Sequence, residues 1–284
     1  MEDTSCTRFL PGMAVESPPQ KLYHYTTLAN LASILGNRKI RCRRLDLVDD
    51  LTEGHPSDFP SLAQYIFVSC WSQGSEESIP LWHMYSAGMR GVRISLPSSF
   101  LLEHTYYSEP DKGFHVEGEP KFVIPQADIH GPDYFFWLVP GRYPLYQVRY
   151  TDDQAKLSPR IVTQTGEGIE LALAEIGIWK GTNWKFQREW RVKIVAFPAA
   201  APGGSHADPE YQRKMNPLPR IMNRQQISID HVDLDIRPSD LLNMEITLGP
   251  KFHAGDRRLL ESYLGQHELQ GIMVSESALL GTIR

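Results

Sequence analysis

The shortness of the periodic segments constrains the fold of this chain more than any other feature. The apolar run YIFVSCWS (65–72) has the length and composition of a buried strand, and GVRISL (91–96) alternates as a half-buried strand does. The helical patterns are equally short, and Gly and Pro residues separate them. The sequence therefore predicts a single α+β domain in which strands predominate and helices are short.

The N-terminal part of the chain predicts the order strand, helix, strand, strand, helix, strand. Apolar residues recur at helical spacing over residues 28–35, with Thr26 or Thr27 as the cap. This places His24 on the strand that leads directly into the helix. A second short helix is predicted at 78–88, where a proline stands in the first turn.

The remainder of the chain carries weaker signals. We expect residues 1–20 to be a flexible segment, residues 21–284 to form the domain, and residues 105–144 to be an irregular insertion with one strand, KFVIP. The segment AAAPGGSHADP (199–209) has the composition of a flexible loop. Further strands are predicted at 145–150, 189–197, 227–234, 242–251 and 271–277, and further helices at 169–180 and near 255–265.

Charge and hydropathy restrict the partners. A formal net charge of −5 gives no overall attraction to phosphate, so a nucleic acid would have to bind at a local basic patch. No apolar run reaches the length of about 18 residues that a bilayer requires, and the N-terminal segment lacks the basic-then-apolar order of a secretory signal. We therefore expect a cytoplasmic protein without a membrane partner.

Several familiar chemistries fit the sequence badly. Cys6, Cys42 and Cys70 are widely spaced, so we expect reduced thiols, two of them buried, and neither disulfides nor a cysteine-based zinc site. The histidines are scattered without the spacing of a ligand set, and no metal is expected. The chain contains no GxGxxG, GxxxxGK[ST], GxSxG or HExxH motif. A hydrolase with a serine or zinc nucleophile is therefore disfavoured.

A local basic patch does occur in RKIRCRR (38–44). Alternation along a strand would place Arg41 and Arg43 on one face, where both could contact phosphate. The alternative is a solvated edge strand whose charges prevent pairing with other strands.

The segment EWRVKI (189–194) alternates cleanly and carries the strongest candidate for chemistry. Its period of two sends the apolar residues to one face and Glu189, Arg191 and Lys193 to the other. The two cations would hold Glu189 ionised if they lie near it. The same pattern also suits an ordinary strand with a charged, half-exposed outer face.

Trp82 and Tyr85 are three residues apart in IPLWHMYSAG (79–88). On a helical turn they would share a face and could form an aromatic wall for a flat ligand. Packing into the core is the alternative for aromatic residues at this spacing.

Several stretches of the chain, in order, resemble a known bacterial family, called domain of unknown function twenty-nine seventy-one. They are LYHYTTLANLASIL, FVSCWS, LWHMYSAGMRGVRISL, IWKGTNWKFQREWRV, EITLGPK and VSES, across most of residues 20–280. More remotely, the chain resembles the ADP-ribosyltransferase fold, in which a histidine-bearing strand runs into a short helix and a late strand begins with glutamate. This resemblance implies a split, mainly antiparallel sheet core and NAD as the substrate.

The opening YHYTTLANLASIL is similar to that of DNA-modifying ADP-ribosyltransferase toxins and of the poly-ADP-ribose polymerases. By this resemblance His24 would bind the adenine-side ribose, Thr26 would lie beside it, and the backbone of Tyr25 would hold the nicotinamide amide. The polymerases have glycine where Tyr25 stands, a difference that bears on the shape of the nicotinamide pocket. If His24 is not a ligand, it is a core histidine bonded to a backbone carbonyl.

The same resemblance makes Tyr85, with Trp82 as the alternate, the residue that stacks on nicotinamide, and Glu189 the catalytic acidic residue. Cleavage of the nicotinamide–ribose bond develops an oxocarbenium-like cation, which a nearby carboxylate stabilises in the transition state. An aromatic face orients the flat nicotinamide ring.

The pyrophosphate of NAD needs cations, and Arg41, Arg43 or Arg191 would supply them. Two functional classes follow. The first is an NAD-consuming transferase or glycohydrolase, such as a toxin or a phage-defence effector, whose acceptor is a nucleic acid or a protein. The second is a catalytically inactive module of the same fold that binds a partner protein or a nucleotide.

Overall fold

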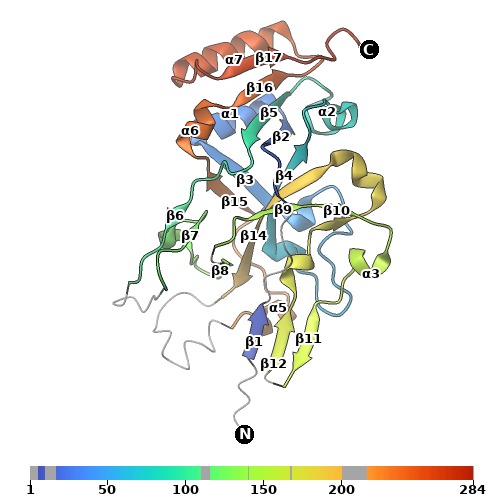
Figure 1. The fold of residues 1–284 in the computed structure, drawn as a ribbon, viewed down its shortest axis with the longest axis vertical. Coiled ribbons are helices and arrows are strands. Elements are labelled where there is room, and N and C mark those ends of the chain that lie inside the picture. The colour runs from blue at the N-terminus through green and yellow to red at the C-terminus, as the bar shows by residue number, and fades with distance from the viewer. Residues whose placement is uncertain are drawn as a thin grey trace.

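A ten-stranded, mainly antiparallel sheet organises the part of the chain that the computed structural model describes, residues 6–9, 17–109, 116–139, 141–166, 168–199 and 216–283 (Figure 1). The helices around the sheet are short. The predicted α+β class, with strands predominating, is therefore confirmed. The predicted loop at 199–209 lies outside the described residues except for its first position.

The main sheet contains β2 (Lys21–Thr26), β3 (Lys39–Arg44), β4 (Ile66–Gln73), β5 (Val92–Pro97), β8 (Tyr134–Trp137), β9 (Leu145–Gln147), β14 (Glu189–Pro198), β15 (His231–Asp235), β16 (Glu245–Leu248) and β17 (Met273–Glu276). The smaller sheets contain β1 (Cys6–Phe9), β11 (Val162–Thr165) and β12 (Gly168–Leu171), then β6 (His104–Thr105) and β7 (Lys121–Phe122), then β10 (Arg149–Tyr150) and β13 (Trp179–Lys180).

The α-helices are α1 (Leu28–Asn37), α2 (Ile79–Tyr85), α3 (Gln154–Leu157), α5 (Leu218–Met222), α6 (Pro238–Leu242) and α7 (Ala254–Gln266). Short 3-10 helices are η1 (Leu45–Leu47), η2 (Ala63–Tyr65), η4 (Gln126–Asp128), η5 (Leu173–Glu175) and η6 (Thr182–Gln187). The helices expected at 28–35, 78–88 and near 255–265 are confirmed as α1, α2 and α7. No helix in the described ranges is both long and apolar enough to cross a bilayer.

The main sheet is split beside β4. One edge of β4 pairs with β14 along nearly its whole length. The other edge pairs with β3 at Phe67 and Val68 and with β2 at Ser72 and Gln73. Residues 69–71 between these points therefore have no strand beside them on that edge. The strands β2, β5, β16 and β17 lie on one side of this gap, and β3 and β15 lie on the other.

Local sequence explains how β2 turns into α1. The side-chain oxygen of Thr27 accepts a hydrogen bond from the backbone N–H of Asn30, which caps the helix. The helix buries Leu31 and Leu35 against the sheet and ends where Arg38 adopts a left-handed conformation with φ of 57°. This short helix returns the chain to β3, so that β2 and β3 lie on the two sides of the gap.

One prediction and one alternative interpretation for residues 169–198 are wrong. Residues 169–180 do not form an α-helix: they form β12, the 3-10 turn η5 and β13, because Gly177 has φ of +73°, which an α-helix does not allow. Leu171, Leu173 and Ile176 are buried from this irregular path. The charged face of β14 is not a half-exposed outer surface, since every residue of that strand is buried.

Smaller elements occupy the two ends of the molecule. β16, β17 and α7 lie at one end of the long axis, and the sheet of β1, β12 and β11 lies at the other (Figure 1). β1 pairs in parallel with β12, so residues 6–9 of the expected flexible segment form a strand. The insertion at 105–144 contains β7, where KFVIP predicted a strand, and also β8.

Candidate functional site

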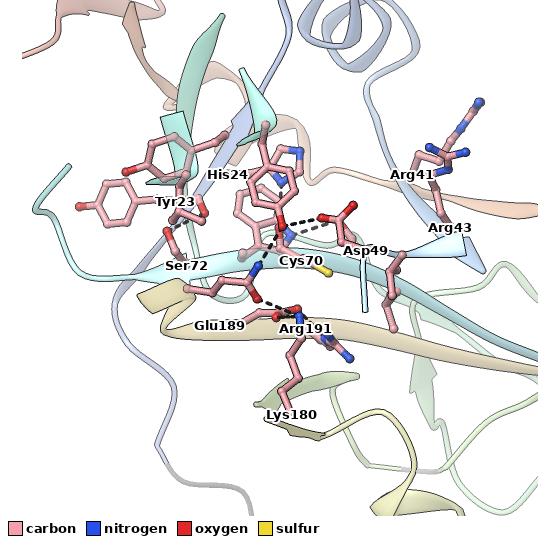
Figure 2. A pocket seen from close by; sticks show the side chains of 18 of the residues that line it. Tyr23, His24, Arg41, Arg43, Asp49, Cys70, Ser72, Lys180, Glu189 and Arg191 are labelled. Atoms are coloured by element: carbon pink, nitrogen blue, oxygen red, sulfur yellow. Dashed lines mark hydrogen bonds and ion pairs between the residues drawn. The ribbon is translucent and has the colours of Figure 1, made fainter. Parts of the chain in front are cut away.

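A pocket of about 290 Å³ opens where the sheet is split (Figure 2). Its lining includes these residues predicted from the sequence: His24, Tyr25, Arg41, Arg43, Tyr85, Glu189 and Arg191. The unpaired stretch 69–71 of β4 also lines it. The strands that begin at Lys21 and at Glu189 thus meet at one pocket, because both pair with β4.

His24 contacts the unpaired stretch of β4 directly. Its Nδ1 lies 2.8 Å from the backbone oxygen of Cys70, and its ring packs against Trp71. Burial lowers the pKa of His24, although the bond to the Cys70 carbonyl opposes this shift, so the ring is neutral at pH 7. Because a carbonyl only accepts, Nδ1 carries the proton, and Nε2 is left as an acceptor for a ligand hydroxyl. His24 therefore bonds to a backbone carbonyl, as the core-histidine alternative expected, and also forms part of the pocket wall.

Trp82 does not take the role predicted for it. Its side chain is fully buried, donates from Nε1 to Glu77, and packs edge-on against Tyr25 in a small second core with Met89. It is absent from the pocket lining, so its assignment as the alternate stacking residue is wrong. Tyr85, one turn further along α2, does line the pocket.

The hydroxyl of Tyr85 is held from two sides. It donates to Asp49 Oδ2 at 2.6 Å and accepts from Gln187 Nε2 at 2.8 Å. Burial, followed by the bond to Asp49, raises the pKa of Tyr85, so the phenol stays protonated. These two bonds fix the ring as part of the pocket wall.

Tyr25 and Thr26 are less available than the resemblance implied. The Tyr25 side chain is buried, and its hydroxyl accepts from the backbone N–H of Ser78. Thr26 is buried and lines a neighbouring cavity instead of this pocket.

Glu189 belongs to a buried cluster of two carboxylates and two cations. Arg191 Nε donates to Glu189 Oε1 at 2.5 Å, and Lys180 Nζ donates to Glu189 Oε2 at 3.0 Å. Both cations also bind Glu53: Arg191 with both Nη groups, and Lys180 across 3.3 Å. No side chain of the four is more than 5% exposed. The cluster is therefore neutral overall and largely shielded from bulk water, and three of its members, Glu189, Arg191 and Lys180, line the pocket.

These charges decide the ionisation of Glu189. Burial alone would raise its pKa, but the charges of Arg191 and Lys180 outweigh burial and lower the pKa to about 2. Glu189 is thus a carboxylate at neutral pH and an acceptor of hydrogen bonds. The expectation that Lys193 would be its second cation is wrong, because Lys193 Nζ donates to backbone carbonyls within residues 173–176.

The backbone before β14 sets the position of Glu189. Arg188 ends η6 in a left-handed conformation with φ of 45°, and its carbonyl accepts from the N–H of Gln73. The N–H of Glu189 then donates to the hydroxyl of Tyr150 at 2.8 Å. These backbone hydrogen bonds therefore fix the first residue of β14 independently of the contacts of its side chain.

Two arginines of β3 lie between this pocket and a second cavity of about 390 Å³, which shares Arg41, Arg43 and His24 with it. Arg41 forms a bidentate pair with Asp233. The Arg43 side chain makes no hydrogen bond or ion pair with the residues that the structure describes, and it extends with Arg41 on the right of Figure 2. The edge-strand alternative does not hold, since β3 pairs with β15 and β4.

Sequence reasoning missed Glu53, Lys180, Asp49 and Gln187. Lys180 did carry a signal, since it is the only cation in the largely apolar stretch 169–180, and a lysine that is buried in such a stretch needs a partner for its charge. Glu53 stands in a polar stretch, and nothing in its sequence context indicated that it would be buried. Its partners lie more than 100 residues away, on β13 and β14.

Neither a metal site nor a relative among known proteins indicates what the pocket does. Within the described ranges, no group of three or more His, Cys, Asp or Glu side chains could hold a metal ion. Cys42 and Cys70 are free thiols, the first buried and the second partly buried.

Comparison with protein-family models, with curated proteins and with solved structures gives no match. The resemblance to the bacterial family and to ADP-ribosyltransferases stays a prediction.

Proposed function

We propose that the pocket binds NAD and that the protein cleaves its nicotinamide–ribose bond, as an ADP-ribosyltransferase or an NAD glycohydrolase. The observation that supports this most is that His24, Tyr85 and Glu189 line one pocket at the split of the sheet. An aromatic face, a neutral imidazole and an ionised carboxylate are the groups that positioning and cleaving NAD require.

The cleavage can be written from these groups. The bond between ribose C1 and the nicotinamide nitrogen breaks, both electrons leave with neutral nicotinamide, and an oxocarbenium-like ribose remains. Each oxygen of Glu189 has two lone pairs, and Arg191 and Lys180 each occupy one oxygen. The carboxylate can therefore still accept from a ribose hydroxyl. Water, or an acceptor in a nucleic acid or protein, then attacks C1 and loses a proton.

The two neighbouring cavities suit the two halves of a dinucleotide. The pocket with Glu189 would hold the nicotinamide riboside, and the second cavity, lined by polar side chains such as Asn30 and Ser33, would hold the adenosine. Arg43 stands at their boundary, and its side chain has no hydrogen-bond or ion-pair partner among the residues that the structure describes. A pyrophosphate that bridges the cavities would pair with it.

One observation favours the second candidate, a catalytically inactive binding module. The charge of Glu189 is already balanced by Arg191 and Lys180, which weakens its field at a developing cation. Such a module would bind NAD or a related nucleotide in the same pocket without releasing nicotinamide.

Calorimetric titration with NAD, together with detection of released nicotinamide, tests the proposal. We expect binding, and we expect Arg43→Ala to weaken it about tenfold, since a hydrogen bond to a charged group contributes about 1.5 kcal/mol. Arg258→Ala, at an exposed arginine of α7 outside the pocket lining, is the matched control and should bind NAD as the wild type does. Absence of NAD binding would refute the proposal, and binding without nicotinamide release would select the inactive module.

A further inference from the structure

Glu53 contacts two residues of the pocket lining, Arg191 and Lys180, and does not itself line the pocket. Its side chain is 1% exposed, on the loop between η1 and η2. The loop holds it in a defined place: Gly54 has φ of +80°, and a Cβ there would come within 2.7 Å of Ala63. The Gly54 carbonyl also accepts from the N–H of Leu62. Glu53 is thus delivered to the cluster by a turn that only glycine fits.

The contacts of Glu53 are with the two cations that hold Glu189. It accepts from both Nη groups of Arg191, one of them at 3.0 Å, while Arg191 Nε faces Glu189. It also pairs with Lys180, whose Nζ reaches the other oxygen of Glu189. Glu53 therefore bridges the two cations that hold Glu189. Without its charge, Arg191 and Lys180 would have only Glu189 as a counter-ion, and the buried cluster would carry a net positive charge.

We propose that Glu53 is a positioning residue for the reaction at this site: it anchors Arg191 and Lys180 so that they fix the Glu189 carboxylate toward the pocket. The inference rests on the proposed function, since Glu189 must act on a bound substrate for its orientation to matter. Because Glu53 does not line the pocket, it would not contact a bound substrate, and it acts only through the two cations. A displacement of the carboxylate by an ångström lowers turnover far more than affinity.

The first test compares NAD affinity with the rate of nicotinamide release in Glu53→Gln. We expect the rate at saturating NAD to fall roughly tenfold or more and the Kd for NAD to stay within about twofold. Leu264→Ala is the control, because Leu264 is buried in α7 away from the pocket, and its truncation destabilises the fold without touching the cluster. A Glu53→Gln rate within twofold of the wild type, or losses no different from those of Leu264→Ala, would overturn the proposal.

A second readout does not depend on activity. The fully buried guanidinium of Arg191 should give slowly exchanging Nε and Nη proton signals in the NMR spectrum of the wild type. In Glu53→Gln the Nη signals should exchange faster or broaden, and the Nε signal should shift as Glu189 is released. Unchanged Arg191 signals in the variant would refute the positioning role. If the wild type binds no NAD while these signals do change, the proposed function fails and the anchoring by Glu53 stands.

Discussion

Glu189→Gln should destabilise the fold in a way that depends on pH. The pKa of Glu189 is lowered from 4.5 to about 2, and each pKa unit corresponds to about 1.4 kcal/mol. The ionised carboxylate therefore contributes about 3 kcal/mol to the free energy of unfolding, fully present above pH 4.5 and lost as the pH falls toward 2. Glutamine resembles the protonated form in shape and charge. The variant should thus be about 3 kcal/mol less stable than the wild type at pH 7, and the difference should shrink in acid.

Urea unfolding followed by tryptophan fluorescence, at a series of pH values from 7 to 3, measures this difference. Glu261→Gln is the control, because Glu261 is exposed on α7 and pairs with Arg257 at the surface, where a pair contributes only about 0–1 kcal/mol. A Glu189→Gln difference below 1 kcal/mol at pH 7, or one that does not change with pH, would refute the account of the cluster.

Two further predictions separate the pocket from the core. Tyr85→Ala should weaken NAD binding about 2- to 13-fold, since stacking contributes about 0.5–1.5 kcal/mol beyond area burial; normal affinity with a lower melting temperature would instead place Tyr85 in the core. Trp82→Phe should leave NAD affinity unchanged and reduce the free energy of unfolding by about 1–3 kcal/mol, because the hydrogen bond from the buried indole to Glu77 is lost. Calorimetry measures the affinity and urea unfolding the stability; weaker NAD binding at unchanged stability would contradict the assignment of Trp82 to the core.

Local pattern was enough to predict the part of the site that lies near α1. A strand, a threonine cap and an amphipathic helix follow one another in sequence, so the place of His24 in the second half of β2 depends on few long-range contacts. The spacing of Trp82 and Tyr85 likewise predicted one helix face. The spacing could not show that this helix face contacts both the small second core and the pocket. Trp82 is buried in that core, and Tyr85 lines the pocket wall.

The cluster around Glu189 could not be predicted in the same way. Alternation along β14 separates its two faces correctly, but it does not reveal whether the charged face is covered. That face is buried because η5, β13 and the loop with Glu53 pack over it, and these segments lie at distant places in the sequence. The stretch 169–180 was wrongly predicted as a helix for a related reason: most of its apolar residues are buried, as in an amphipathic helix, but Gly177 has a positive φ that interrupts any helix.

The rate of nicotinamide release from saturating NAD, measured on the wild type and on Glu189→Gln with the Kd for NAD alongside, tests the central claim most directly. The assay belongs at pH 7 and at a temperature where both proteins are folded, because the variant is less stable. We predict that the wild type releases nicotinamide and that the variant does so roughly a hundredfold more slowly, about 2.7 kcal/mol in the barrier, with a similar Kd. Equal rates would remove Glu189 from the mechanism, and no release by the wild type with water, nucleic acid or protein as acceptor would contradict the claim that this pocket cleaves NAD.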